Sequence, residues 1–187
     1  AGQEAGEGCH QPVNTKAVDD IAAAHGSELA RAKVGEINVV EEMMRGGARI
    51  GGEGNGGVIS PEVHLGRDSL VGIGYILEMM AVRSQSISEL VASLPRYIMK
   101  KGSIKLAGAG IDPSILKRLE KEFDTQKISN IDGLRIEFIA PHEFAGGWVH
   151  LRPSNTEPIF RIISEGRDEA HAAAIYSHFE QILKPGI

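Results

Sequence analysis

The chain has 187 residues, 42% of them hydrophobic and 24% charged, with a formal net charge of −5. Such a chain can form one large or two small globular domains, each with its own core. Its acidic balance argues against a nucleic-acid partner, whose binding surface normally carries an excess of Lys and Arg. No apolar run approaches the roughly 18 residues of a membrane span. One cysteine, Cys9, and no visible signal peptide predict a cytoplasmic protein.

The first half of the chain predicts an α/β domain. Residues 1–12 are rich in Gly and Glu, so we expect them to be disordered or a remnant of cloning. Apolar residues at helical spacing predict helices at about 17–25 and 37–45. Short strands are expected at 27–33 and 48–50. The second strand leads directly into a glycine-rich loop.

The loop from Gly51 to Gly57 contains five glycines, which let a backbone approach a ligand closely. Glu53 is its only charged residue, and a carboxylate can accept hydrogen bonds from sugar hydroxyl groups. Asn55 can both donate and accept. The spacing fits neither the dinucleotide-binding fingerprint nor the P-loop. From the residues alone, the loop is either a sugar-binding loop or a plain flexible hairpin.

A strongly apolar helix follows, capped by Asp68 or Ser69 and reaching Ala81, and its wide apolar face predicts packing on a sheet. A second helix is expected at 86–94, ended by Pro95. We place the boundary of a first domain, residues 13–97, before a hinge at 98–102 that contains Lys100-Lys101-Gly102.

Residues 103–187 predict a small α+β domain with an antiparallel sheet and two helices. Asp132-Gly133 is typical of a hairpin turn. Strands are expected at 103–107, 148–151 and 159–164. The helices are expected from Pro113, with Asp112 as the cap, and at 168–183. In the last helix, His171 and His178 are interpreted as solvent-exposed.

The most informative segment joins the last two strands and reads Arg-Pro-Ser-Asn-Thr-Glu-Pro, from Arg152 to Pro158. Arg152 has a planar fork of donors that fits phosphate oxygens. Ser154, Asn155 and Thr156 add short donors and backbone N–H groups, which together can bind an anion. A polar β-turn is the plain alternative.

Two further residues have open interpretations. Arg161 on the next strand either points back at this loop or forms a salt bridge at the sheet edge, and Lys33 at a strand end is either a surface or a functional lysine. No nucleophile–base pair and no metal-ligand spacing is apparent, so no catalytic or metal residue is expected in the chain. The expected site is therefore a binding site.

Both loops resemble those of a known family. Arg152 to Pro158 is similar to the phosphate-binding loop of the α-D-phosphohexomutases, which include phosphoglucomutase, phosphomannomutase and phosphoglucosamine mutase. Gly51 to Gly57 is similar to their sugar-binding loop and precedes it, as the family requires. The resemblance extends from about Val13 and implies the C-terminal half of such an enzyme. That half comprises an incomplete three-layer α/β/α third domain and an α+β fourth domain.

The resemblance also implies a role for each residue. Glu53 and Asn55 would bind the sugar, and Lys33, before a Val-Gly step, would reach the active site. The phosphate would be held by residues of the second loop and the following strand, namely Arg152, Ser154, Asn155, Thr156 and Arg161. Many family members have Ser and His where Asn55 and Gly57 stand here, so the resemblance does not identify the hexose.

The family's phosphoserine loop and its triple-aspartate Mg²⁺ loop have no match in this chain. By resemblance, the parent enzyme is an isomerase that moves phosphate between positions 6 and 1 of a hexose through an enzyme phosphoserine and a hexose 1,6-bisphosphate. Mg²⁺ and the phosphoserine would belong to the N-terminal half of the same polypeptide, which is then a partner of this half. We expect the isolated chain to be inactive. The alternative is a stand-alone phosphosugar-binding module.

Overall fold

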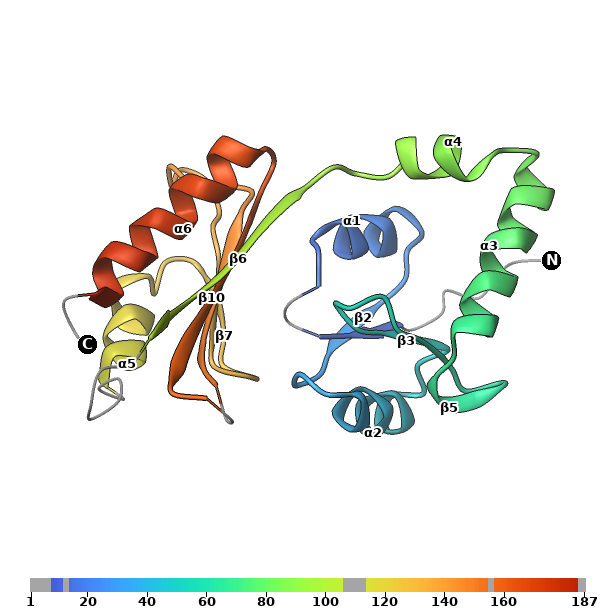
Figure 1. Cartoon of the computed structure of the whole chain (residues 1–187), viewed down its shortest axis with the longest axis horizontal. Coiled ribbons are helices and arrows are strands. Elements are labelled where there is room, and N and C mark those ends of the chain that lie inside the picture. Colours follow the sequence, from blue (N-terminus) through green and yellow to red (C-terminus); the bar gives the residue numbers. More distant parts are fainter. Residues whose placement is uncertain (1–7, 12–13, 106–113, 155–156, 185–187) are drawn as a thin grey trace. The chain divides into compact units, whose positions relative to one another are not determined.

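The structure is a computed structural model that describes residues 8–11, 14–105, 114–154 and 157–184. The chain forms two compact units, unit 1 from Ala1 to Pro95 and unit 2 from Arg96 to Ile187 (Figure 1). Unit 1 is a mixed α/β domain, and unit 2 is a small domain with an antiparallel sheet and two helices on it. The expected fold class is therefore confirmed.

Unit 1 is built on a five-stranded sheet in the order β2-β1-β3-β4-β5. β1 pairs with both β2 and β3 in parallel, whereas β3, β4 and β5 are antiparallel neighbours. The strands are β1 (Gly8–His10), β2 (Leu29–Arg31), β3 (Ile50–Gly52), β4 (Val58–Ser60) and β5 (His64–Arg67).

Two helices cover the sheet of unit 1. Helix α1 (Ala17–Ala24) follows β1 and helix α2 (Glu36–Gly46) follows β2, and they lie on opposite faces of the sheet (Figure 1). Helix α2 buries Val39 and Met43 against the strands and ends at Gly47, which adopts the left-handed conformation common at helix ends. This arrangement gives the three layers expected for the domain.

Strand β1 corrects the expectation that residues 1–12 are disordered. Gly8–His10 is the strand with parallel neighbours on both sides, and Cys9 is buried in the core of unit 1. Three residues that include Gly and His show no periodicity, so a strand of this length leaves no local signal. Residues 1–7 and 12 lie outside the described part.

Helix α3 (Ser69–Arg83) begins as predicted, because the Asp68 carboxylate accepts hydrogen bonds from the N–H groups of Leu70 and Val71. Its predicted packing is wrong. No residue of α3 is buried, and Leu70 and Val82 are each 78% exposed. The helix meets the sheet chiefly along β4, and most of its apolar surface is exposed.

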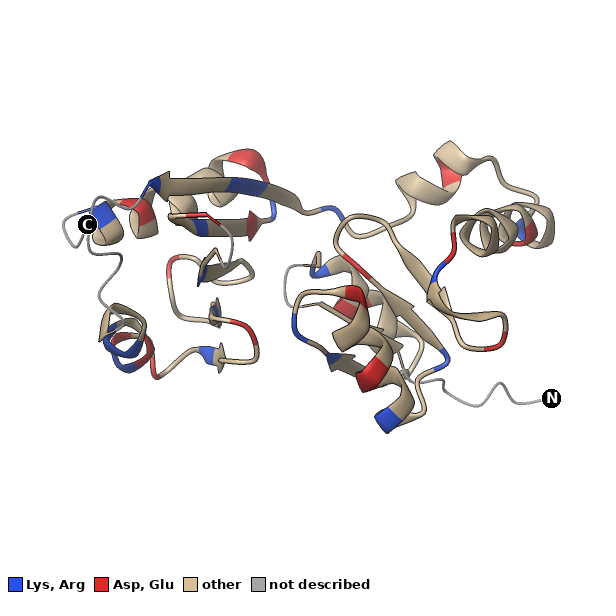
Figure 2. Cartoon of the chain, turned by 60° about the horizontal axis from the view of Figure 1, so that its bottom comes forward, with Lys and Arg blue, Asp and Glu red and all other residues tan. Residues whose placement is uncertain are grey.

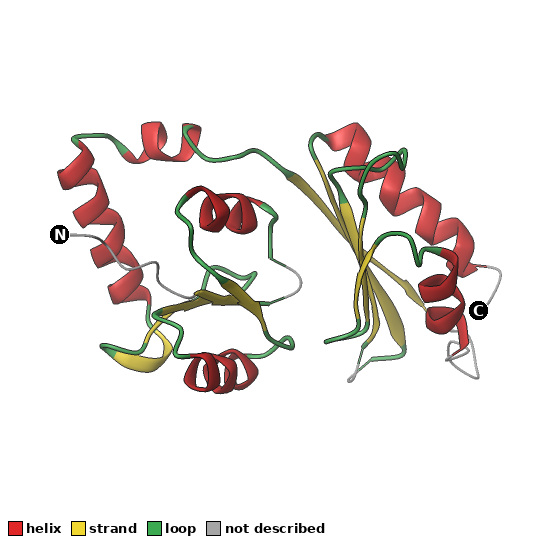
Figure 3. Cartoon of the chain, turned by 180° about the vertical axis from the view of Figure 1, so that it is seen from behind, coloured by secondary structure: helices red, strands yellow, loops and turns green. Residues whose placement is uncertain are grey.

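Unit 2 contains an entirely antiparallel sheet in the order β6-β10-β9-β8-β7. The strands are β6 (Ile98–Lys105), β7 (Lys127–Ser129), β8 (Leu134–Glu137), β9 (Trp148–Pro153) and β10 (Ile159–Gly166). Figure 3 shows helices α5 (Ser114–Glu122) and α6 (Glu169–Leu183) on the same side of this sheet.

The segment 98–102, predicted as a hinge, is part of β6. The glycine at its end serves packing rather than a turn, because a Cβ at Gly102 would lie 2.1 Å from the hydroxyl oxygen of Tyr176 on α6. The Lys-Lys-Gly sequence resembles a turn signal, but its pairing partner, β10, is about sixty residues away in sequence and invisible to a local pattern.

The core of unit 2 lies between the sheet and the two helices, and the opposite face carries charged side chains together with the buried Trp148. The side chains on the core side include Leu134, Ile136, Val149, Leu151, Phe160, Ile162, Ile175 and Phe179. His171 is buried and His178 packs edge-on against Phe123, so the interpretation of both histidines as solvent-exposed is wrong.

Lysine and arginine are interspersed with acidic residues over both units (Figure 2). Within the described residues, no helix has the length and apolar character needed to span a bilayer.

Candidate functional site

A first candidate site lies at the carboxyl edge of the parallel strands of unit 1. Because β1, β2 and β3 run in the same direction, the residues that follow them meet at one edge of the sheet, where α/β domains bind ligands. Gln11 follows β1 and donates from Nε2 to Oε1 of Glu53, which follows β3, at 2.6 Å. Lys33 follows β2 and is exposed. The topology therefore places the predicted lysine and glutamate on the same edge.

The glycine loop is a tight turn that holds Glu53. The backbone N–H of Glu53 donates to the carbonyl of Gly57, and that of Gly56 donates to the carbonyl of Glu53, both at 3.0 Å. Gly56 has a φ of +92°, which favours glycine. Asn55 is exposed; its side-chain oxygen accepts from the N–H of Gly57 at 3.0 Å, and its amide lies 3.4 Å from Glu53. Asn55 thus supports the loop.

Arg67 on β5 is a site residue that sequence reasoning missed. Its Nε lies 2.7 Å from Oε2 of Glu36 and 3.2 Å from Oε2 of Glu53, which joins α2 to the glycine loop. A Cβ at Gly57 would lie 2.5 Å from Cδ of Arg67, so the glycine leaves room for the arginine. The hydrogen bonds from Arg67 lower the pKa of the Glu36 carboxyl.

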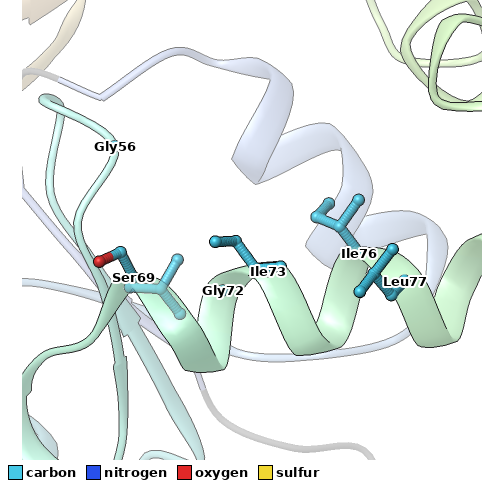
Figure 4. A pocket seen from close by; sticks show the side chains of 7 residues that line it. Gly56, Ser69, Gly72, Ile73, Ile76 and Leu77 are labelled. Atoms are coloured by element: carbon cyan, nitrogen blue, oxygen red, sulfur yellow. The ribbon is translucent and has the colours of Figure 1, made fainter.

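A hollow of about 440 Å³ lies beside the loop, between Gly56, Val58 and helix α3 (Figure 4). Its walls are apolar side chains and backbone, with Ser69 the one polar side chain. A phosphosugar needs charged and hydrogen-bonding groups. This hollow therefore belongs to the exposed apolar surface of α3, and the polar site is formed by Glu53 and its neighbours.

A second candidate site lies in unit 2, on the sheet face opposite the helices. Arg152 on β9 and Arg161 on β10 are direct partners across the two strands, so their side chains leave the same face side by side. Their neighbours in sequence, Leu151 and Phe160, point the other way into the core. Of the two alternatives for Arg161, the structure shows features of both, since Arg161 lies beside Arg152 and also forms a salt bridge with Glu157 of the loop.

Each of these guanidinium groups has an acidic neighbour and a buried Nε without a partner among the described residues. Nη1 of Arg152 lies 3.3 Å from Oδ2 of Asp132, and Nη2 of Arg161 lies 3.5 Å from Oε2 of Glu157. The Nε atoms of both arginines are buried and have no hydrogen-bond partner among the described residues. Two cations side by side with unpaired buried donors favour an anion between them.

The loop after β9 is closed by backbone hydrogen bonds. The N–H of Ser154 donates to the carbonyl of Ile159 at 2.9 Å, and the N–H of Ile159 donates to the carbonyl of Glu157 at 2.7 Å. Ser154 is thereby placed next to the arginine pair. Asn155 and Thr156 lie outside the described residues.

His150 and Asp132 lie beside the arginines and were not predicted as site residues. Nε2 of His150 is hydrogen-bonded to the main-chain carbonyl oxygen of Asp132. Because a carbonyl oxygen can only accept a hydrogen bond, Nε2 is the donor. Burial lowers the pKa of His150 to about 4, and the charges of Arg135 and Arg152 act in the same direction. His150 is therefore neutral at pH 7.

No cluster of three or more His, Cys, Asp or Glu residues that could hold a metal ion occurs in the described part of the chain. The acidic groups nearest the site, Asp132 and Glu157, are instead paired with arginines.

Comparison with known families matches residues 2–97 to the phosphoglucomutase/phosphomannomutase α/β/α domain III and residues 105–181 to the C-terminal domain of the same family. The chain belongs to this family. A phosphoglucomutase/phosphomannomutase of Thermococcus kodakarensis is 38% identical over 157 residues, which are 83% of this chain and 33% of the relative. The chain thus spans about a third of that relative's length.

Solved phosphohexomutases share the fold. A phosphoglucomutase/phosphomannomutase family protein from Burkholderia thailandensis matches with a TM-score of 0.77 and 25% identity, over 97% of this chain and 38% of that one. N-acetylphosphoglucosamine mutase of Aspergillus fumigatus, solved in complex with GlcNAc-6P and magnesium, matches with a TM-score of 0.68 over 99% of this chain and 40% of its own. At 14% identity, the second match concerns the fold alone.

Proposed function

We propose that this chain is the sugar- and phosphate-binding half of a phosphohexomutase that interconverts hexose 6-phosphate and hexose 1-phosphate, the hexose being glucosamine, mannose or glucose. The observation that carries this proposal is the cross-strand pair of Arg152 and Arg161, each with a buried Nε that has no partner within the described part of the chain. A phosphate dianion would accept from both guanidinium groups and offset their repulsion.

Each predicted residue has a role in this proposal. Arg152, Arg161 and Ser154 hold phosphate, and the resemblance adds Asn155 and Thr156. Glu53, held by Gln11 and Arg67, accepts hydrogen bonds from sugar hydroxyls, while Asn55 holds the loop and offers its amide. Lys33 is the candidate active-site lysine, at the same sheet edge as Glu53. A fixed phosphate clamp contributes by positioning, since it holds one end of the substrate while the other end reacts.

The chemistry of phosphate transfer is assigned to the part of the polypeptide that the relatives have and this chain does not match. A phosphoserine and Mg²⁺ would reside there, and a hexose 1,6-bisphosphate would be the intermediate. We therefore expect no turnover from this chain alone. Turnover by the purified chain would contradict this assignment.

Binding is tested by calorimetric titration of the chain with inorganic phosphate and with glucosamine 6-phosphate. Arg152→Ala and Arg161→Ala should each weaken both ligands at least about tenfold, because each removes a charged hydrogen-bonding group. Arg118→Ala, on the exposed side of α5, is the matched control and should leave both affinities unchanged. Unchanged binding by both site variants would refute the proposal.

The two loops are separated by a second substitution. Glu53→Gln should weaken glucosamine 6-phosphate and leave inorganic phosphate unaffected, because Glu53 is assigned to the sugar. Equal loss of both ligands would contradict that assignment. A stand-alone phosphosugar-binding module would give the same binding results. The order of the two matched domains, III and then the C-terminal domain, supports the mutase.

A further inference from the structure

The turn between β7 and β8 lies directly against the residue that is assigned to phosphate. The last paired residues of the β8–β9 ladder are Leu134 and Leu151, so the turn residues Asp132 and Gly133 continue beyond it, next to Arg152. A Cβ at Gly133 would lie 2.7 Å from Cβ of Arg152 and 2.4 Å from the carbonyl oxygen of Leu151. The turn therefore contacts the backbone of β9 where Arg152 begins.

Asp132 contacts this strand through both its side chain and its main chain. Its carboxylate oxygen Oδ2 lies 3.3 Å from Nη1 of Arg152, and its carbonyl accepts from Nε2 of His150. His150 and Arg152 are two residues apart on a strand and share one face of the sheet. The turn is thus fastened at two points to the same face.

The atom that Asp132 contacts decides which edge of the guanidinium stays available. In the arginine guanidinium group, an N–H of Nε and an N–H of Nη2 point in the same direction and form the side edge of the group, whereas Nη1 lies away from that edge. Because Asp132 occupies Nη1, the side edge is left for a bidentate ligand. The Nε atom on that edge is the buried donor without a partner among the described residues.

We propose that Asp132 is a positioning residue, which holds Arg152 by Nη1 so that its Nε–Nη2 edge faces the phosphate. This role rests on the proposed function of Arg152. His150 contributes by fixing the carbonyl of Asp132 and thereby the turn. Asp132 acts through Arg152 and need not touch the substrate.

A carboxylate near a phosphate has two opposite effects, and their balance gives the proposal its test. Its charge repels the phosphate, so removing the carboxylate would strengthen binding if repulsion dominated. Its hydrogen bond orders a long and flexible side chain, so removing it would weaken binding if orientation dominated. Asparagine at this position separates the effects, because its amide oxygen still accepts from Nη1 and carries no charge.

The test compares Asp132→Ala, Asp132→Asn and the wild type in titrations with inorganic phosphate and glucosamine 6-phosphate. Asp132→Ala should bind both ligands about tenfold more weakly, the scale of losing one hydrogen bond between charged groups. Asp132→Asn should retain wild-type affinity or exceed it. The control Glu180→Ala removes one negative charge from α6, on the other side of the sheet, and should change neither affinity.

A second readout does not depend on affinity. In the ligand-free protein, the ¹⁵N–¹H signal of Arg152 Nε should be sharp in the wild type and in Asp132→Asn and broadened in Asp132→Ala, while a circular dichroism spectrum checks that each variant is folded. Binding by Asp132→Ala as tight as wild type, or tighter, would overturn the positioning role and leave the proposed function intact. If the wild type binds neither inorganic phosphate nor glucosamine 6-phosphate, the positioning role of Asp132 and the proposed function both fail.

Discussion

The turn at Gly133 supports Arg152, and a pair of glycine substitutions measures that support. Gly133 and Gly146 both belong to unit 2 and both have positive φ, +78° and +87°. A Cβ at Gly133 would lie 2.4 Å from the carbonyl oxygen of Leu151, whereas nothing lies within 4 Å of a Cβ at Gly146. The two positions share a backbone conformation and differ in their contact with β9.

Alanine at either position costs about 1–2 kcal/mol of unfolding free energy, because of the left-handed backbone. Only Gly133→Ala adds a clash. Non-bonded heavy atoms need about 3.5 Å, so the turn or β9 must move by roughly 1 Å. Overpacking of this kind costs about 1–3 kcal/mol more. Gly133→Ala should therefore lower the free energy of unfolding by about 2–5 kcal/mol in total, and Gly146→Ala by only the about 1–2 kcal/mol that comes from the left-handed backbone.

Urea unfolding followed by tryptophan fluorescence measures the difference, because Trp148 is the single tryptophan and is fully buried in β9 of unit 2. A phosphate titration of both variants completes the assay. Gly133→Ala should also bind phosphate more weakly, since the clash displaces Arg152, and Gly146→Ala should bind normally. Equal losses of stability in the two variants would refute the reasoning, as would unchanged phosphate affinity in Gly133→Ala.

Three further predictions follow from burial and exposure. Burial lowers the pKa of His150 from 6.5 to about 4, so neutral His150 contributes about 3 kcal/mol to the free energy of unfolding above pH 6.5, and this contribution is lost as the pH falls toward 4. In urea unfolding at pH 7 and pH 4.5, the free energy of unfolding should therefore change less between the two pH values in His150→Gln than in the wild type. An equal change in both proteins would contradict this. Burial raises the pKa of the Cys9 thiol to about 11, which lowers the population of the reactive thiolate, so alkylation of Cys9 at pH 8 should be about 100-fold slower in the folded than in the unfolded protein. Equal alkylation rates would contradict the burial of Cys9. The double variant Leu70→Glu with Val82→Glu on exposed α3 should change the free energy of unfolding by under about 1 kcal/mol and reduce the binding of an apolar dye. Ile59→Ala in the core should instead cost about 2–5 kcal/mol. A loss of that size in the α3 variant would mean that the apolar side chains of α3 are packed.

Local chemistry made most of the helices predictable. Asp68, Ser86 and Asp168 cap α3, α4 (Ile87–Ala92) and α6 as their residue types suggest, and Asp132-Gly133 does form the β7–β8 hairpin. Each signal lies within a few residues of the element that it marks, and such signals survive folding because nearby backbone groups satisfy them.

Elements that depend on distant partners were not predictable in this way. β1 and β5 have three and four residues and are defined by their pairing with other strands. Residues 98–102 of β6 looked like a hinge because their partner β10 is remote in sequence, whereas a strand was predicted from residue 103. The exposed apolar surface of α3 was also missed, since periodicity identifies an apolar face and does not reveal what covers it.

The candidate site residues show the same contrast between local and distant sequence signals. Its two loops are continuous motifs, so Glu53 and Arg152 could be proposed from the sequence. The residues that hold them come from elsewhere in the chain: Gln11 is 42 positions from Glu53, and Asp132 is 20 positions from Arg152. Only the folded chain brings these pairs together.

The central claim, that Arg152 and Arg161 together hold phosphate, is tested most directly by observing their Nε–Hε signals in a ¹⁵N spectrum while glucosamine 6-phosphate is added. Both signals should shift in a saturable manner with one common affinity, and the signal of Arg118 should stay in place. If neither signal of the pair shifts, or if both change no more than that of Arg118, the arginine pair is not a phosphate site and the proposed function is wrong.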